Sequence, residues 1–354
     1  MSVLDLVRED LRAFAGYASA RREKVTGQVW LNANESPWAS SADSGQGLNR
    51  YPEPQPAALR ARMAELYDVP VERLMVTRGS DEGIDLLVRA FCRAGLDGVL
   101  IAPPCFGMYA VSAKVQNAPL VEVPLVDEDT HFSLDLTAVE DVVGYGEVRA
   151  IFLCSPANPT GQALSLKEIR NLARAASDKA VLVIDEAYGE FSSVSSARAL
   201  LDEFPHLVIL RTLSKAYAMA GARIGAVLAD PDVIAVLRSL QAPYPVPAPS
   251  ATIALAALSA EAQAESRERI ATLIRERKAL LKLLPGVPGV ARVYPSEGNF
   301  LLVRFDDPSA AFARLLASGV VVRDMRAMPQ LADALRISVG TPDENAALIR
   351  ALTQ

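Results

Sequence analysis

The stretch AVLVIDEAY (180–188) decides the predicted fold, because its apolar run leads without a break into the carboxylates Asp185 and Glu186. A short run of β-branched and aliphatic residues that does not alternate with polar ones is typical of a strand buried on both faces, as in a parallel sheet. Similar runs occur at GVLIAPP (98–104), RAIFLCSP (149–156) and LVILRTLSK (207–215). Together the runs predict a mainly parallel, buried central sheet.

Segments of helical periodicity separate these runs, and LSLKEIRNLARAAS (164–177) is the clearest example. Strands that alternate with helices form an open α/β sheet with helices on both faces. Ligands of such sheets bind at the carboxyl ends of the strands. We therefore expect the functional residues immediately after the strand runs.

The proline-rich stretch QAPYPVPAPS (241–250) predicts a domain boundary, because closely spaced prolines continue neither a helix nor a central strand. We expect a large domain in residues 36–245 and a smaller α/β domain in residues 246–354. An N-terminal segment, residues 1–35, is expected to pack with the smaller domain. That domain has its own strand candidates: NFLLVRF (299–305), GVVVRDM (319–325) and ALRISVG (334–340).

Composition excludes several classes of function. The chain has 354 residues and a formal net charge of -6, and it has no run of basic residues that would bind nucleic acid. Residues 1–17 mix apolar and charged side chains, which predicts an amphipathic helix rather than a signal peptide. Because no apolar run reaches the ~18 residues needed to cross a bilayer, we expect a cytoplasmic protein.

Cysteine and histidine contribute little to the predicted chemistry. The 3 cysteines, Cys92, Cys105 and Cys154, are widely spaced, and the 2 histidines, His131 and His206, have no ligand partner at metal-binding spacing. The pattern predicts no disulfide framework, no metal site and no histidine-based triad. Ionic chemistry then depends on lysine, tyrosine, carboxylate or a bound cofactor.

The segment RTLSKAYAMAGARIG (211–225) suggests the charge of such a ligand. Its cations Arg211, Lys215 and Arg223 have no neighbouring carboxylate, which indicates an anionic partner. The other strand ends are ambiguous when taken singly. Asp185 suits a helix cap or surface position as well as a ligand contact, and Asn158 in CSPANPTG suits a turn. The helix start in TRGSDEG (77–83) could bind phosphate or only be capped.

Taken together and in this order, these segments resemble the fold-type I pyridoxal-5'-phosphate aminotransferases of class II. The resemblance covers nearly the whole chain. It implies that Lys215 binds the cofactor aldehyde covalently and that Asp185 pairs with the pyridine nitrogen and keeps it protonated. It further implies that Asn158 and Tyr188 hydrogen-bond the phenolate oxygen of the ring. Lys215, Asp185 and Tyr188 are thus the expected catalytic residues.

The same resemblance implies contacts for the rest of the cofactor. Phosphate would be held by Gly79, Ser80, Asp81, Ser214 and Arg223. Phe106 in PPCFGMY would stack on the pyridine face, with an ordinary core phenylalanine as the alternative. Tyr51 in NRYPEPQP would reach the cofactor of a neighbouring subunit, which implies a homodimer with shared sites; otherwise it is an exposed turn tyrosine. No role is implied for Arg211.

Smaller matches, including GYASARR, VWLNANESP and VVVRDM, resemble the histidinol-phosphate aminotransferases. This implies a reversible transamination in histidine biosynthesis, in which histidinol phosphate and 2-oxoglutarate give imidazole-acetol phosphate and glutamate. Arg323 and Arg336 would bind the phosphate of one substrate and the carboxylate of the other, with Tyr17, Asn34 and Tyr51 nearby.

Other functions remain compatible with the cofactor residues. An aromatic aminotransferase or a phosphothreonine decarboxylase would share all of them and differ only in the anion pocket. A regulator that binds the cofactor without catalysis is disfavoured, because such proteins usually carry a DNA-binding domain and the sequence begins without a basic extension.

Overall fold

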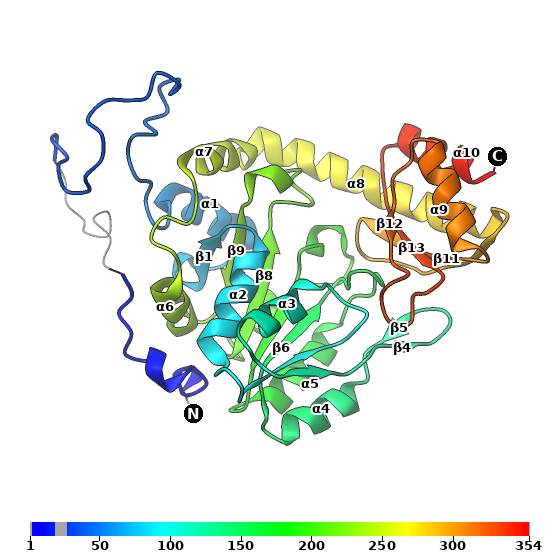
Figure 1. The fold of residues 1–354 in the computed structure, drawn as a ribbon, viewed down its shortest axis with the longest axis horizontal. Helices are drawn as coiled ribbons and strands as arrows, with labels where there is room; N and C mark the ends of the chain where they lie inside the picture. The colour runs from blue at the N-terminus through cyan, green and yellow to red at the C-terminus, as the bar shows by residue number, and fades with distance from the viewer. Residues whose placement is uncertain (1, 18–26, 354) are drawn as a thin grey trace.

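A seven-stranded sheet forms the centre of the protein (Figure 1). The structure, a computed structural model, describes residues 2–17 and 27–353 of the chain. The strand order is β1-β9-β8-β7-β6-β2-β3, and of the described strands in this sheet only β9 runs antiparallel to its neighbours. The strands are Leu74–Thr77 (β1), Gly98–Ile101 (β2), Leu120–Glu122 (β3), Val148–Cys154 (β6), Val181–Asp185 (β7), Leu207–Thr212 (β8) and Gly225–Leu228 (β9).

Helices cover both faces of this sheet because alternate strand residues point to opposite sides. On one side Leu182 and Ile184 pack in the cluster of α1, α4, α5 and α7, and on the other Val181 and Val183 pack with α2, α3 and α6. These helices are Ala57–Tyr67 (α1), Ser80–Phe91 (α2), Met108–Val115 (α3), Leu136–Gly144 (α4), Leu166–Ala176 (α5), Pro231–Leu240 (α6) and Ala248–Ala257 (α7). The mainly parallel α/β sheet expected from the sequence is confirmed.

The four apolar runs used for the prediction became β2, β6, β7 and β8, whereas β1, β3 and β9 of this sheet were not predicted. The edge strand β3 has only 3 residues. The strands β1 and β9 are 4 residues long and fully buried. So short an apolar run is indistinguishable in sequence from a turn of buried helix.

A second, four-stranded sheet forms the smaller domain, with the order β10-β11-β13-β12. Its elements are Val290–Val293 (β10), Phe300–Phe305 (β11), Arg323–Asp324 (β12), Ala334–Ser338 (β13), and the helices Ala260–Leu283 (α8), Pro308–Ala317 (α9) and Pro342–Thr353 (α10). The strand expected over 319–325 is reduced to two residues. Gly319 has a positive φ of 75° and Val321 is 81% exposed, so this segment approaches the sheet as a loop.

The change from one core to the other lies later in the chain than the boundary expected at residue 245. Val246, Ala251 and Ala254 pack in the core of the large domain, because α7 lies against α1. Leu280, near the end of α8, packs with the small sheet instead. The long helix α8 therefore connects the two domains, and the prolines of 243–249 mark a turn within the large domain (Figure 1).

The described start of the chain also differs from expectation. Two short 3-10 helices, Val3–Asp5 and Glu9–Leu11, replace one amphipathic helix, because Arg8 between them has non-helical backbone angles and its N–H donates to Ala90 O at 3.0 Å. Val3, Leu6 and Val7 are buried with residues of α2 and α6. Residues 2–16 therefore pack on the large domain of this chain and not on the small one.

Residues 27–56 form an arm that extends away from the compact body and returns to it at Tyr51, which stacks on Tyr244, and at Gln55, whose Nε2 donates to Val76 O at 2.9 Å (Figure 1). In this described stretch no helix or strand occurs, and Leu31 and Trp38 are largely exposed. Part of the GYASARR match, residues 18–22, lies outside the described residues. Within residues 2–17 and 27–353, no helix is long and apolar enough to cross a bilayer.

A small hairpin connects the two domains. Its strands, Val126–Asp127 (β4) and Phe132–Ser133 (β5), extend from the large domain to the small sheet. Asp127 accepts hydrogen bonds from Tyr294 Oη and Arg304 Nη2, each at 2.8 Å, and Phe132 packs with Tyr294 and neighbouring apolar side chains. The hairpin thus fixes the small domain over the carboxyl ends of the large-domain strands.

Candidate active site

The polar residues that follow β6, β7 and β8 surround one cavity of about 130 Å³. The strand register places Cys154 beside Asp185 and Asp185 beside Leu210, so that the loops after the three strands meet at one edge of the sheet. The cavity is lined by Ser80, Asp81, Phe106, Cys154, Asn158, Asp185, Ala187, Tyr188, Thr212, Ser214, Lys215, Ala220 and Arg223. The structure thus brings together most of the residues to which the sequence pointed.

Asp185 is the acidic end of the cavity. Its carboxylate is only 2% exposed and accepts hydrogen bonds from Tyr109 Oη at 2.7 Å and from the Ala187 N–H at 3.1 Å. Burial raises the pKa of Asp185 to about 6, and these two hydrogen bonds oppose the rise. A cationic ring nitrogen would stabilise the charged form further.

Lys215 enters the same cavity from the loop after β8. Burial lowers the pKa of Lys215 below its usual range, and the positive charge of Arg336 lowers it further, more than that of Arg223 does. The effect of Arg336 on Lys215 could not be inferred from neighbouring sequence, because Arg336 comes from the small domain. A lysine of lowered pKa is suited to nucleophilic attack and to proton transfer.

Asn158 and Tyr188 form a hydrogen-bonded pair on a third side of the cavity. The amide Nδ2 of Asn158 donates to Tyr188 Oη at 3.2 Å, and Arg336 Nη1 donates to Asn158 Oδ1. The Lys215 ammonium lies 5.7 Å from the centre of the Tyr188 ring. Arg336 Nε is buried and has no hydrogen-bond partner among the described residues, although a guanidinium in such a place normally meets an anion.

The opposite end of the cavity suits a phosphate. Here α2 begins at Ser80 after Gly79, whose φ of 75° favours glycine, and no side chain among the described residues caps this helix start. Free N–H groups at a helix start bind anions. Arg223 lies against Gly79, since a Cβ built on Gly79 would be 2.6 Å from Arg223 Nη2.

The side chain of Asp81 pairs with Arg223, whereas the family resemblance implies that Asp81 contacts the phosphate. Its carboxylate accepts a hydrogen bond from Arg223 Nη2 at 2.9 Å and is thereby paired with a cation. A carboxylate would repel phosphate, so only the backbone N–H of Asp81 suits a phosphate contact.

These donors and acceptors fit pyridoxal phosphate. An acid lies at one end for the ring nitrogen, cationic and N–H donors lie at the other for phosphate, and an amine of lowered pKa lies between them. Phe106, which lines the cavity, meets Tyr109 edge-on with ring centres 5.6 Å apart. Its expected stacking on the cofactor ring stays a prediction.

Other residues expected in the site lie outside this cavity. Tyr51 is half-exposed and stacks on Tyr244 at 4.4 Å between ring centres, and it lines a separate hollow together with Asn34. Tyr17 is 68% exposed. Arg323 lies on β12 with its Cα paired to that of Arg336, but its side chain is exposed.

Arg211, which had no predicted role, is a buried structural cation. Its guanidinium donates to Glu186 at 2.6 Å and to Glu190 at 2.8 Å, and it lies over the Tyr67 ring at 4.8 Å. These carboxylates belong to the segment that carries Asp185 and Tyr188. Arg211 therefore binds the loop after β7 to β8 and does not face the cavity.

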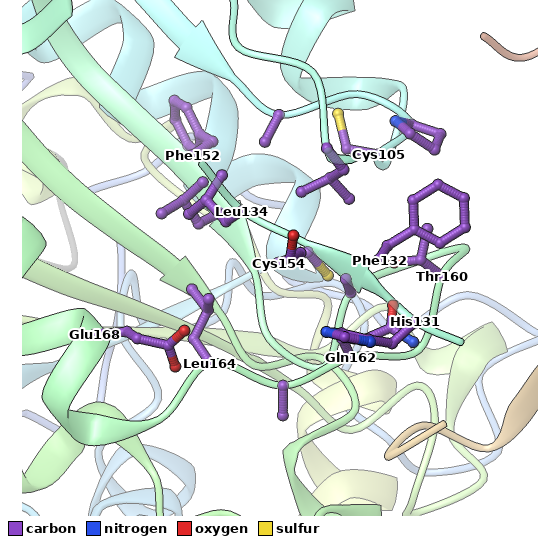
Figure 2. A pocket seen from close by; sticks show the side chains of 17 residues that line it. Cys105, His131, Phe132, Leu134, Phe152, Cys154, Thr160, Gln162, Leu164 and Glu168 are labelled. Carbon is purple, nitrogen blue, oxygen red and sulfur yellow. The ribbon is translucent and has the colours of Figure 1, made fainter. Parts of the chain in front are cut away.

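A second cavity, of about 170 Å³, lies next to the first and shares Cys154 with it (Figure 2). Its walls are mostly apolar and include Phe132, Leu134 and Phe152. None of the residues predicted for the cofactor or the substrate lines it, and it lacks a lysine or arginine. We therefore assign the chemistry to the smaller cavity.

Comparison with known proteins agrees with this geometry. The sequence profile of the family "Aminotransferase class I and II" matches residues 17–352. The chain belongs to the aminotransferase class I and II family. Members of this family use pyridoxal phosphate, which is thus the cofactor of this aminotransferase.

Individual relatives show to which aminotransferases the chain is similar in sequence and fold. This aminotransferase is 56% identical to histidinol-phosphate aminotransferase of Stenotrophomonas maltophilia over 99% of the chain and 96% of the relative. Its fold is similar to that of histidinol-phosphate aminotransferase from Clostridium acetobutylicum, with a TM-score of 0.78, 23% identity, and coverage of 87% of this chain and 90% of that one. The enzyme of Sinorhizobium meliloti in complex with pyridoxal-5'-phosphate has a TM-score of 0.76 at 24% identity, with coverage of 86% and 82%.

The sequence did not reveal the partner of Asp185. Tyr109 stands in the quoted PPCFGMY, three residues after Phe106, but its hydroxyl meets a carboxylate 76 positions later. No pattern in a single sequence indicates a contact of that separation. The apolar residues around Tyr109 instead suggest an ordinary core aromatic.

Proposed function

We propose that this aminotransferase catalyses one reversible reaction, in which histidinol phosphate and 2-oxoglutarate give imidazole-acetol phosphate and glutamate. The relatives that are 54–56% identical over 99% of the chain carry the name histidinol-phosphate aminotransferase, which supports the assignment. The structural observation that carries it is the buried Nε of Arg336, which lies beside the Asn158–Tyr188 pair and has no hydrogen-bond partner within residues 2–17 and 27–353. It offers a forked cationic donor where an anionic substrate would meet the cofactor.

In this proposal each residue of the cavity has one task. Pyridoxal phosphate supplies an electron-withdrawing ring that accepts the electron pair of the substrate Cα–H bond. Asp185 would hold the proton on the ring nitrogen, and Lys215 Nζ in its uncharged form would take the proton from the substrate Cα. Asn158 and Tyr188 orient the ring through its oxygen, and Ser214 and Arg223, with the start of α2, hold the phosphate.

The substrate anion would bind Arg336, and this accounts for one site that accepts two different amines. A guanidinium pairs through two parallel hydrogen bonds with either a phosphate or a carboxylate. Arg323 is the second cation proposed for this pocket. Its place opposite Arg336 on the neighbouring strand supports that assignment.

We further propose a homodimer in which Tyr17, Asn34 and Tyr51 complete the site of the second subunit. The support is their position outside the cavity of their own chain, together with the exposed aliphatic and aromatic side chains of residues 27–56. Such side chains gather at interfaces between subunits. The arm that carries Tyr51 and Asn34 is the element proposed to lie across the partner.

The substrate proposal is tested by steady-state turnover with histidinol phosphate and 2-oxoglutarate, against phenylalanine and O-phosphothreonine as alternative substrates. We expect kcat/KM to be highest for histidinol phosphate. Absence of turnover on it, with turnover on phenylalanine or decarboxylation of phosphothreonine, would replace the proposed substrate. Lys215→Ala should remove the visible absorption of the bound cofactor and leave little turnover; normal activity would exclude the lysine from catalysis.

The shared site is tested by mixing two inactive variants. Lys215→Ala and Tyr51→Phe chains are unfolded together, refolded together and assayed. A hybrid dimer has one site with both Lys215 and Tyr51 intact, so activity should exceed that of either variant alone. No recovery from a preparation that light scattering shows to contain dimers would mean that Tyr51 does not act across the interface.

A further inference from the structure

Tyr109 is wholly buried directly behind Asp185. It belongs to the first turn of α3, and its Oη donates to Asp185 Oδ2 at 2.7 Å, so it touches a carboxylate that lines the cavity. The hydroxyl does not itself line the cavity. Tyr109 therefore acts on the site only through the residues that do line it.

The surroundings of Tyr109 leave its ring one position. One face stacks on Phe152 at 5.3 Å with an interplanar angle of 19°, and its edge meets Phe106 at 5.6 Å with an angle of 84°. Both neighbours are fixed by the sheet and by the turn before α3. A ring held on two sides directs its hydroxyl along one line, and that line ends at the Asp185 carboxylate.

The hydroxyl is a permanent donor. Burial, followed by the neighbouring charge of Asp185, holds the pKa of Tyr109 well above its usual range, so the phenol stays protonated wherever the enzyme works. The Asp185 carboxylate accepts hydrogen bonds from Tyr109 and from the Ala187 N–H, and the Tyr109 bond is the stronger opponent of the burial that raises the pKa of Asp185. Without that bond the carboxyl would be more readily neutral and free to rotate.

We propose that Tyr109 is a positioning residue of this enzyme, whose hydroxyl orients the Asp185 carboxylate toward the ring nitrogen of the cofactor and keeps it charged. The same ring supports Phe106 on the other wall, so one side chain adjusts two contacts with the cofactor ring. The proposal rests on the proposed function in one respect, namely that Asp185 faces that nitrogen.

Tyr109→Phe tests this, because it removes only the hydroxyl and keeps both ring contacts. We expect the apoenzyme to bind pyridoxal phosphate roughly 10- to 100-fold more weakly, the range for one hydrogen bond to a charged group. The pH midpoint of the visible absorption of the bound cofactor should shift in the same direction as in Asp185→Asn, by a smaller amount. Cofactor titration of the apoenzyme and a pH series of spectra measure both without an activity assay.

Tyr67→Phe is the matched control, since Tyr67 is also buried but its ring contacts Arg211, which does not line the cofactor cavity. It should leave cofactor affinity and the absorption midpoint unchanged, which separates a positioning role from general loss of packing. Circular dichroism and thermal unfolding of all variants establish that they are folded.

A double variant makes the outcome decisive. If Tyr109 acts through Asp185, adding Tyr109→Phe to Asp185→Asn should change affinity much less than it does alone. Additive effects, or an unchanged affinity and midpoint in Tyr109→Phe, would overturn the proposal. Failure of the wild-type apoenzyme to bind the cofactor would instead overturn the proposed function, so the two failures are distinguishable.

Discussion

Gly225→Ala should damage cofactor binding although Gly225 does not itself line the cofactor cavity. Gly225 begins β9 and pairs with Thr77 on one side and Thr212 on the other. A Cβ on this residue would lie 2.5 Å from Gly79 C and 2.6 Å from Ser80 N. Both are backbone atoms at the start of α2, so no side-chain rotation relieves the clash.

The size of the effect follows from those distances. Carbon atoms in contact prefer about 3.5 Å, so the turn at Gly79 must withdraw by roughly 1 Å. Overpacking of this kind costs about 1–3 kcal/mol of stability. A donor that moves by ~1 Å no longer makes a good hydrogen bond, and losing one such bond to phosphate weakens binding roughly 10- to 100-fold.

Titration of the apoenzyme with pyridoxal phosphate, followed by its absorption, measures the affinity, and thermal unfolding measures the stability. Gly221→Ala, four residues before Gly225, is the control, because a Cβ there meets no atom of the described residues within 4 Å. It should bind the cofactor like the wild type. Wild-type affinity in Gly225→Ala would refute the inference that the start of α2 holds the phosphate.

Two further predictions concern buried charge. Arg211→Met leaves Glu186 and Glu190 buried without their cation and should lower the free energy of unfolding, measured in urea, by about 3–5 kcal/mol. Arg170→Met, which removes an exposed ion pair, should barely change the urea midpoint. Asp185 has a pKa of about 6 in the folded apoenzyme against a usual value of 3.8, so the folded state binds the extra proton between those values and loses stability as the pH rises through them. The free energy of unfolding of the Asp185→Asn apoenzyme should therefore rise relative to that of the wild type by up to about 3 kcal/mol between pH 4 and pH 7. The same difference between variant and wild type at both pH values would contradict this.

Sequence and structure contributed different parts of the site. Asp185, Asn158 and Lys215 were predictable because each stands directly after a buried strand run, and parallel strands bring their carboxyl ends to one edge. Arg211 shows the limit of that reasoning. It belongs to the same cationic segment as Lys215, yet its side chain is turned toward buried carboxylates and not toward the cavity.

By itself the sequence determined the mainly parallel α/β sheet, the sheet edge at which the candidate site lies and the residue types gathered there, because hydrophobic periodicity and strand-end position are local properties. Only the tertiary structure decided that Tyr109 supports Asp185, that Arg336 from the small domain lowers the pKa of Lys215, and that the cores separate along α8. Each of these depends on side chains far apart in the chain. Their pairing is set by the packing of whole elements, which no short stretch of sequence encodes.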